Sequence, residues 1–378
     1  MYLDFQIITP MKIKFLFLTF ILFSQLSFGQ LTAKTNAVIS LIGNQINSDL
    51  QKDNLHGSIS VAILKNDRVI WAGAFGHSQM EKDVPADTNN IYRIGSITKV
   101  FTATLLMQMV EEGKIKLDDP VENYLPEIKN LKDYDKYSKI TFRQLASHTA
   151  GLKREPELRG ADVGPLDQWE QKVLACISKT SYNSKPGEQF LYSNIGFAML
   201  GLAISRAAGV PYMQMVQQRI LDPLHMTDTY FALTDDKLSR LAQGMSNGNG
   251  GVNIDLPARE LKGRGYRVPN GGIYSTPRDL AKFAMSLTGK LALLSAKSWK
   301  QMQEVPPGGE KYGLGLMLYK SADLDVIGHN GSVPGYTSEM GIDQPSGYAV
   351  ILMRNYNIGS TNLTSIAHLA LKALKQAD

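Results

Sequence analysis

Two hydrophobic periods alternate along the chain, and a period of two comes first. Residues 58–64 and 68–73 are rich in β-branched and aromatic side chains, and the turn Lys65-Asn66-Asp67 joins them, which predicts a hairpin. Similar runs return late, at residues 313–319, 324–327, 337–342 and 348–353. We therefore expect β-strands at both ends of the chain.

Helical spacing dominates the remaining sequence. The pattern predicts helices over residues 31–51, 100–112, 195–208 and 212–221. The last predicted helix, over residues 361–376, is amphipathic, and its expected core positions are Leu363, Ile366, Leu369, Leu371 and Leu374. Helices and loops thus fill the middle of the chain, between the two groups of strands.

This order of elements predicts an α/β (α+β) fold. Distant strands would form one antiparallel sheet, flanked by the N- and C-terminal helices and interrupted by a helical insertion. We expect a discontinuous sheet lobe (residues 30–95 and 287–378) and a mainly helical lobe (residues 96–286). A cleft between two lobes is the usual place for a small-molecule site.

The first 29 residues are typical of a secretory signal peptide. Lys12 and Lys14 precede an apolar run over residues 15–23 that only Thr19 interrupts, and Ser27-Phe28-Gly29 supplies small residues before Gln30. Residues 1–10 do not fit the pattern, so Met11 is an alternative start. We expect export to the periplasm or the medium. The alternative interpretation is an uncleaved membrane anchor, although no second apolar run long enough to span a membrane follows.

Composition and charge narrow the function classes. The net charge is +5, but no block of Lys and Arg and no nucleic-acid motif is present, so we expect a small-molecule or peptide substrate and no nucleic-acid partner. Cys176 is the only cysteine, which excludes an intramolecular disulfide and cysteine-based zinc sites. The histidines His56, His225 and His368 are scattered in the sequence. We expect a monomer with no metal and no cofactor.

Ser96-Ile97-Thr98-Lys99 is the only Ser-x-x-Lys in the chain and opens a predicted helix. Residues three apart share a helix face, so the Lys99 amine could help to deprotonate the Ser96 hydroxyl. Exposed N–H groups near a helix N-terminus also favour developing negative charge. The alternative is that Ser96 only caps the helix and Lys99 is a solvated surface residue.

Two further motifs bear on this choice. Tyr192-Ser193-Asn194 is the only Tyr-x-Asn and leads into an apolar helix; Tyr192 could transfer protons and Asn194 could hold a substrate carbonyl, or both could be structural. Free Tyr and Lys have pKa values near 10, and in a shared buried site the charge of one could depress the pKa of the other. His329-Asn330-Gly331 ends a predicted strand, where Gly331 would permit close approach and the next N–H, of Ser332, could serve an oxyanion hole.

These motifs and their surroundings resemble the serine β-lactamase and penicillin-binding superfamily in its class C branch. The resemblance covers residues 57–353 and includes the segments 92–99, 140–152, 186–196, 271–280 and 328–331. The branch contains class C β-lactamases, D-Ala-D-Ala carboxypeptidases, D-aminopeptidases and carboxylesterases. The resemblance implies a β-lactamase/transpeptidase-like fold and a serine hydrolase that works through an acyl-enzyme.

The resemblance also implies a role for each motif residue. Ser96 would be the acylated nucleophile, Lys99 and Tyr192 would share the proton transfers, and Asn194 would position the substrate. The segment His329, Asn330 and Gly331 would line the opposite wall, and the N–H groups of Ser96 and Ser332 would form the oxyanion hole.

One departure redirects the expected substrate. Class C β-lactamases carry Lys-Thr-Gly where this chain carries His329-Asn330-Gly331, so an imidazole that is mostly neutral at pH 7 replaces a permanent cation. This favours a D-amino-acid peptide or a carboxylic ester over a β-lactam. There are two alternatives. The protein could be a class C-like β-lactamase with weak activity, or a penicillin-binding sensor that is acylated with little turnover. The segment 155–159 is similar to the Glu-x-Glu-Leu-Asn of class A β-lactamases, but it precedes Tyr192, and we interpret it as coincidental.

Overall fold

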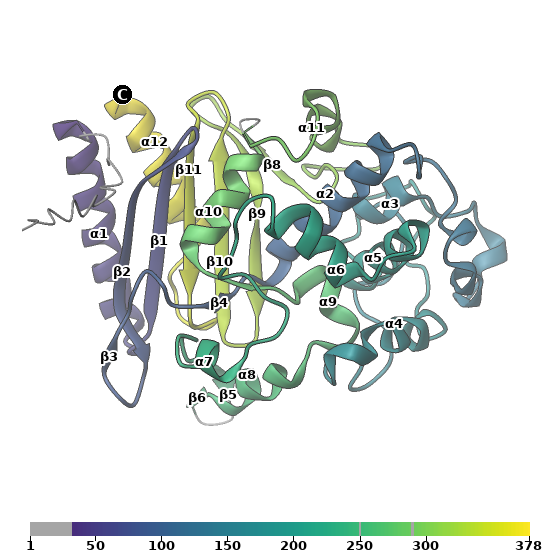
Figure 1. Cartoon of the computed structure of the whole chain (residues 1–378), viewed down its shortest axis with the longest axis horizontal. Helices are drawn as coiled ribbons and strands as arrows, with labels where there is room; N and C mark the ends of the chain where they lie inside the picture. Colours follow the sequence, from purple (N-terminus) through teal and green to yellow (C-terminus); the bar gives the residue numbers. More distant parts are fainter. Residues whose placement is uncertain (1–31, 249–250, 289–290) are drawn as a thin grey trace, which may run out of the picture. The chain divides into compact units, whose positions relative to one another are not determined.

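Strands from both ends of the sequence form one antiparallel sheet. The computed structural model describes residues 32–248, 251–288 and 291–378, and in this part the sheet has seven strands in the order β3-β2-β1-β11-β10-β9-β8 (Figure 1). Their bounds are β1 Ser58–Lys65, β2 Arg68–Gln79, β3 Val84–Pro85, β8 Met317–Lys320, β9 Asp325–Val333, β10 Tyr336–Asp343 and β11 Tyr348–Arg354. The predicted signal peptide and Met11 lie outside the described residues.

Both faces of the sheet are covered, which is why its central strands are buried along their whole length. In β1, Ile59, Val61 and Ile63 pack with α1 (Ala33–Asp53) and α12 (Leu363–Ala377), whereas Ala62 and Leu64 face the opposite core. Helix α10 (Pro277–Ser286) lies on that opposite face, against β1, β2 and β11 (Figure 1). The α/β fold with terminal helices flanking an antiparallel sheet is therefore confirmed.

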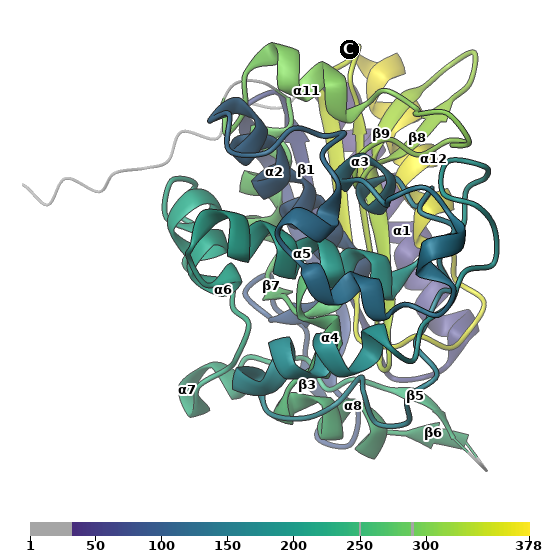
Figure 2. The same ribbon diagram turned by 90° about the vertical axis from the view of Figure 1, so that its right-hand side faces the viewer.

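The helical elements from the middle of the chain lie in front of the sheet in Figure 2, whereas α1 and α12 lie behind it. Helix α2 (Thr98–Glu111) is buried nearly all round and contacts α5 (Asn194–Ala208) and α9 (Val268–Gly271). The other α-helices are α3 Phe142–Ala146, α4 Trp169–Ile177, α6 Tyr212–Val216, α7 Asp235–Leu238, α8 Asp255–Arg259 and α11 Ala296–Met302. Cys176 is a buried free thiol in α4.

The contacts group residues 31–378 into one compact unit. The division into a sheet lobe and a helical lobe with a cleft between them stays a prediction. Helix α10 belongs by sequence to the predicted helical lobe, although it packs on the sheet. Among the described residues, no single helix is long and apolar enough to cross a membrane; the pair α5 and Tyr212–Leu221, bent by 80°, meets the length and composition criteria together.

Two local predictions were wrong. Strand β8 begins at Met317 rather than residue 313, because Gly315 adopts a positive φ of 71° and its N–H binds the Ala146 carbonyl. Leu369 is 52% exposed, since it falls off the stripe that Ile366, Ala370 and Leu374 form on α12. The short strands β5 (Ser246–Gly248) and β6 (Gly251–Asn253) pair with each other in an antiparallel arrangement.

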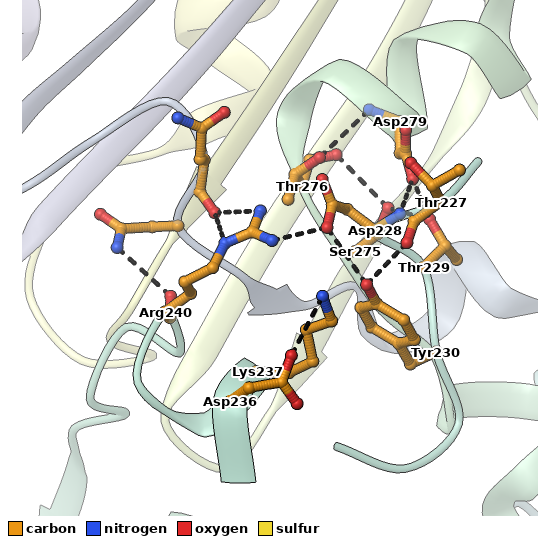
Figure 3. A network of polar contacts seen from close by, with 12 residues as sticks. Thr227, Asp228, Thr229, Tyr230, Asp236, Lys237, Arg240, Ser275, Thr276 and Asp279 are labelled. Atoms are coloured by element: carbon orange, nitrogen blue, oxygen red, sulfur yellow. Dashed lines mark hydrogen bonds and ion pairs between the residues drawn. The ribbon is translucent and has the colours of Figure 1, made fainter. Parts of the chain in front are cut away.

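A polar network holds the segment that pairs with the strand before Ser96 (Figure 3). The buried Asp279 carboxylate accepts hydrogen bonds from the Asp228 N–H at 2.6 Å and the Thr229 hydroxyl at 3.1 Å, while Thr276 caps α10. Strand β7 (Tyr274–Ser275), directly before this cap, pairs with β4 (Tyr92–Arg93). The network therefore fixes the chain three residues ahead of Ser96.

Candidate active site

Ser96 lies in a tight turn that is pressed against strand β9. The turn is a 3₁₀ helix, η1 (Gly95–Ile97), and α2 follows at Thr98, so the predicted helix begins two residues after Ser96. Gly95 has a φ of +51°, and a β-carbon there would lie 2.9 Å from the Ser332 nitrogen. A β-carbon on Gly331 would lie 2.0 Å from the Ile94 carbonyl oxygen. The two glycines thus let the Ser96 turn and the backbone at Ser332 come into contact. The group that approaches Gly331 closely is the Ile94 carbonyl of the protein itself.

Lys99 is fully buried directly behind Ser96. Its Nζ lies 3.1 Å from Ser96 Oγ, 2.8 Å from Asn194 Oδ1 and 3.0 Å from the Asn270 carbonyl oxygen. Burial holds the pKa of the Lys99 ammonium group well below its usual value; the nearby Glu155 carboxylate opposes this effect, and nearby arginines add to it. The alternative of a solvated surface lysine is wrong for this position.

Tyr192 completes the group around the Ser96 hydroxyl. Its ring centroid lies 4.8 Å from Lys99 Nζ, and the exposed Arg154 guanidinium lies 4.8 Å from it as well. Burial raises the pKa of the Tyr192 hydroxyl to about 12, and a hydrogen bond with Ser96 opposes the rise. Of the expected Lys–Tyr pair, the lysine therefore has the depressed pKa, and burial rather than the charge of its partner is the main cause.

Asn194 connects Lys99 to the carboxylate of Glu155, which is not among the predicted site residues. Ser193 caps α5 through the Gly196 N–H, and Asn194 starts the helix with its amide oxygen toward Lys99. The Asn194 Nδ2 donates to Glu155 Oε1 at 2.5 Å, and the other Glu155 oxygen accepts from Tyr266. Glu155 thus belongs to the site by its contacts, and the interpretation that segment 155–159 only coincidentally resembles a class A motif stays a prediction.

His329 on β9 has both ring nitrogens engaged within the protein. Its Nδ1 lies 2.5 Å from the Asn330 carbonyl oxygen, which can only accept, so Nε2 accepts from the Tyr312 hydroxyl at 3.0 Å. Burial lowers the pKa of His329 to about 3, and the imidazole is neutral at pH 7. A direct bond from His329 to a substrate stays a prediction and requires one of these contacts to open. Tyr312, which no sequence signal singled out, stands beside it.

Two of the other three predicted residues of this wall are exposed. Asn330 and Ser332 are exposed at alternate positions of β9, and Gly331 between them is buried. Strand β8 pairs with β9 only as far as Gly328. The backbone of β9 beyond that residue therefore offers an edge to an extended ligand.

His148 supports Tyr192 from behind. Its ring centroid lies 4.1 Å from that of Tyr192, and its Nδ1 accepts the Ser193 N–H at 3.0 Å. Its own carbonyl oxygen accepts the Leu191 N–H at 2.7 Å. His148 thus fixes the loop before α5.

One surface cluster could hold a metal ion. His56, His77 and Asp83 each offer a ligand atom, and these atoms lie within 4.8 Å of one another. His56 was expected to be isolated, but the connection before β1 brings it to the β2–β3 hairpin, where His77 Nε2 lies 3.2 Å from Asp83 Oδ1. These segments carry none of the predicted site residues.

A serine hydroxyl and a buried lysine amine in contact beside strand β9 of the antiparallel sheet of an α/β fold define the serine-hydrolase class of protein. The chain belongs to the beta-lactamase family, whose model matches residues 45–375. The resemblance seen in the sequence motifs is therefore confirmed.

Curated relatives share this region. Beta-lactamase-like protein 2 of Dictyostelium discoideum is 31% identical over 308 residues (78% of this chain and 55% of the relative), and protein flp of Staphylococcus aureus (strain N315) is 27% identical over 331 residues (86% and 65%). The chain thus spans between about half and two thirds of the length of these relatives.

Solved structures share the fold. The octameric penicillin-binding protein homologue of Pyrococcus abyssi is 27% identical with a TM-score of 0.73, covering 89% of this chain and 77% of that one. A D-stereospecific amidohydrolase of Streptomyces sp. is 26% identical with a TM-score of 0.70 (88% and 97%). The D-amino acid amidase of Ochrobactrum anthropi SV3, at 24% identity and a TM-score of 0.74 (89% and 99%), shows the fold alone.

Proposed function

We propose that the protein is an exported serine hydrolase that cleaves an amide or ester, a D-amino-acid peptide or a carboxylic ester, through an acyl-enzyme on Ser96. The observation that carries the proposal is the set of contacts of Lys99 Nζ with one hydroxyl and two carbonyl oxygens. A neutral amine has two hydrogens and one lone pair. The carbonyl oxygens of Asn194 and Asn270 can only accept, so they take both hydrogens, and the lone pair is left for the Ser96 O–H.

The proposed acylation step follows from this geometry. Ser96 Oγ attacks the substrate carbonyl carbon, and its proton passes to Lys99 Nζ. The C–N or C–O bond then breaks, and the leaving group receives a proton through the neutral Tyr192 hydroxyl, which Lys99 replenishes. Water then attacks the carbonyl carbon of the acyl-enzyme and gives up a proton to the Lys99 and Tyr192 pair. The bond to Ser96 Oγ breaks, Ser96 recovers its proton, and the carboxylic acid is released. The N–H groups of Ser96 and Ser332 would stabilise the oxyanion, each worth roughly 10²–10³ in rate.

The wall formed by His329, Asn330 and Gly331 supports a preference for substrates other than β-lactams. His329 is neutral and occupied by Tyr312, so this position provides no cation for the carboxylate of a β-lactam. The similar Streptomyces protein is a D-stereospecific amidohydrolase, and the family resemblance supports the same stereochemistry here. We therefore propose D-configured amides as the first substrates to test.

The test combines labelling with turnover. Wild type and Ser96→Ala would be treated with a fluorophosphonate label, and hydrolysis of D- and L-alanine p-nitroanilide, p-nitrophenyl acetate and nitrocefin would be followed. We expect labelling and D-anilide or ester turnover to be lost together in Ser96→Ala and retained in Ser239→Ala, an exposed serine. Full activity in Ser96→Ala contradicts the proposal. Labelling without turnover would identify a sensor, and nitrocefin as the best substrate would identify a β-lactamase.

Export is a separate part of the proposal. The charged start, apolar run and small residues before Gln30 support cleavage after Gly29. Mass spectrometry of the protein recovered from a periplasmic or culture fraction should give Gln30 as the first residue. Recovery of the full-length chain from the cytosol would contradict export and leave the hydrolase proposal standing.

A further inference from the structure

A cavity of about 330 Å³ lies beside strands β8, β9 and β10, and His329 and Asn330 of the predicted site are among its lining residues. Its walls come from β8, β9, β10, α12 and the segment before β8, and it is mostly apolar, with Met317, Met340 and Phe190 among its lining residues. Asn330 lines it as well, and Asn330 pairs directly with Glu339 on β10. The volume is at the lower end of the range of small-molecule sites, which runs from ~300 to 1,000 Å³.

A buried carboxylate in this cavity lacks a full set of partners. Glu339 is 6% exposed, and Thr364 of α12 donates a hydrogen bond of 2.5 Å to its Oε2. Among the described residues, no donor binds Oε1 and no cation forms an ion pair with Glu339. An acidic group without a counter-charge is costly to bury, and this desolvation raises the pKa of Glu339 to about 7.

We propose that the cavity binds a small organic ammonium ion whose charged group pairs with Glu339 and whose apolar body packs on Met317 and the Tyr319 ring, which lie on the same face of the sheet as Glu339. A charge-assisted hydrogen bond from the ammonium group would give Glu339 Oε1 the donor that it lacks, and the apolar walls would remove water from the body of the ligand. A metal ion does not fit this environment, because hard cations require several oxygen ligands and the cavity offers one buried carboxylate, that of Glu339, among mostly apolar side chains, while the Glu310 carboxylate is exposed at the rim.

The charges around the cavity agree with this ligand. Glu310 and Lys311 lie exposed at its rim and offset each other, and the titratable groups Tyr312, Tyr319, His329 and His368 also line it. Burial lowers the pKa values of both His329 and His368, so both imidazoles are neutral at pH 8. Glu339 is then the buried charge that selects the ligand. This inference concerns binding and does not rest on the proposed function.

Calorimetry with two probes of one shape tests the proposal. Phenethylamine is a cation at pH 8, and 2-phenylethanol is its neutral counterpart. We expect wild type to bind the amine at least about tenfold more tightly than the alcohol, and Glu339→Gln to lose this preference while still binding the alcohol. Glu310→Gln, at the rim, should change the amine affinity by no more than about twofold.

Three results would overturn the proposal. These are equal affinity of wild type for the two probes, an unchanged preference in Glu339→Gln, or a preference lost in Glu310→Gln. A second variant guards against misfolding at the buried position: His368→Trp enlarges a half-buried residue on α12 and fills the cavity without touching the carboxylate. It should bind neither probe, and retained binding of the amine would place the ligand elsewhere.

Discussion

Replacing Glu339 with glutamine should make the protein more stable, and the gain should grow with pH. Burial raises the pKa of the Glu339 carboxyl from 4.5 to about 7, and its only hydrogen bond among the described residues comes from Thr364. Glutamine has nearly the same shape and can accept the same bond, but it carries no charge at any pH. The variant therefore isolates the cost of the buried negative charge.

The sign follows from counting protons. The unfolded chain loses the Glu339 proton near pH 4.5, whereas the folded chain keeps it until about pH 7, so the folded state binds more protons in between. Below pH 4.5 the carboxyl is neutral in both states and there is no penalty. As the pH rises through this window stability falls, and above pH 7 the loss amounts to about 3 kcal/mol.

Urea unfolding of wild type and Glu339→Gln measures this loss. The difference in the free energy of unfolding should widen by about 2–3 kcal/mol between pH 5 and pH 8.5, in favour of the variant. The comparison cancels the titration of all other groups. Glu310→Gln is the matched control, because its exposed side chain lines the same cavity and should show no such widening. A difference that stays constant with pH, or a variant less stable than wild type at pH 8.5, would refute the reasoning.

Three further predictions concern the site and its supports. Lys99→Ala and Tyr192→Phe should each slow acylation by roughly 10²–10⁴-fold in stopped-flow labelling, and an unchanged rate would remove that residue from the proton path. Gly331→Ala should abolish labelling and lower the melting temperature, since its β-carbon would lie 2.0 Å from the Ile94 oxygen and overpacking costs about 1–3 kcal/mol; normal labelling would show that β9 can shift. Glu260→Gln should destabilise the fold by about 3–5 kcal/mol in urea, because it leaves the buried Arg93 and Arg264 without their carboxylate, and a loss below 1 kcal/mol would mean that water reaches them.

Elements with a clear hydrophobic period could be predicted closely from the sequence. Strand β1 and helix α12 agree with the predicted ranges to within about two residues, because both bury an apolar face whose spacing is visible in the chain. The start of β8 was mispredicted because a long-range bond decides it: Gly315 donates to the Ala146 carbonyl, and no local pattern encodes that contact. Leu369 shows a related limit, since an apolar residue can lie off the buried stripe.

The candidate site divides in the same way. Ser96, Lys99 and Tyr192 could be proposed from motif order, because their roles are tied to fixed spacings. Glu155 and Tyr312 could not, since each is identified only by a partner far along the chain: Asn194 for the first and His329 for the second. The segment around Glu155 resembled a motif of class A β-lactamases, but it precedes Tyr192 instead of following it. No sequence pattern indicated a role for Tyr312.

The Ser-x-x-Lys spacing supports the proposed acylation only if the Lys99 amine is neutral, and that neutrality depends on residues far away in the sequence. Helix geometry brings the Lys99 amine to the Ser96 hydroxyl, but a lysine in water would be charged and could not accept a proton. The two acceptors that take its hydrogens come from residues 194 and 270, which lie 95 and 171 positions away, and the packing of α5 and α9 on α2 removes the solvent. A variant that disturbs either acceptor, such as Asn194→Ala, should therefore impair acylation even with Ser96 and Lys99 unchanged. In this site the motif places the atoms, and the assembled fold sets their protonation.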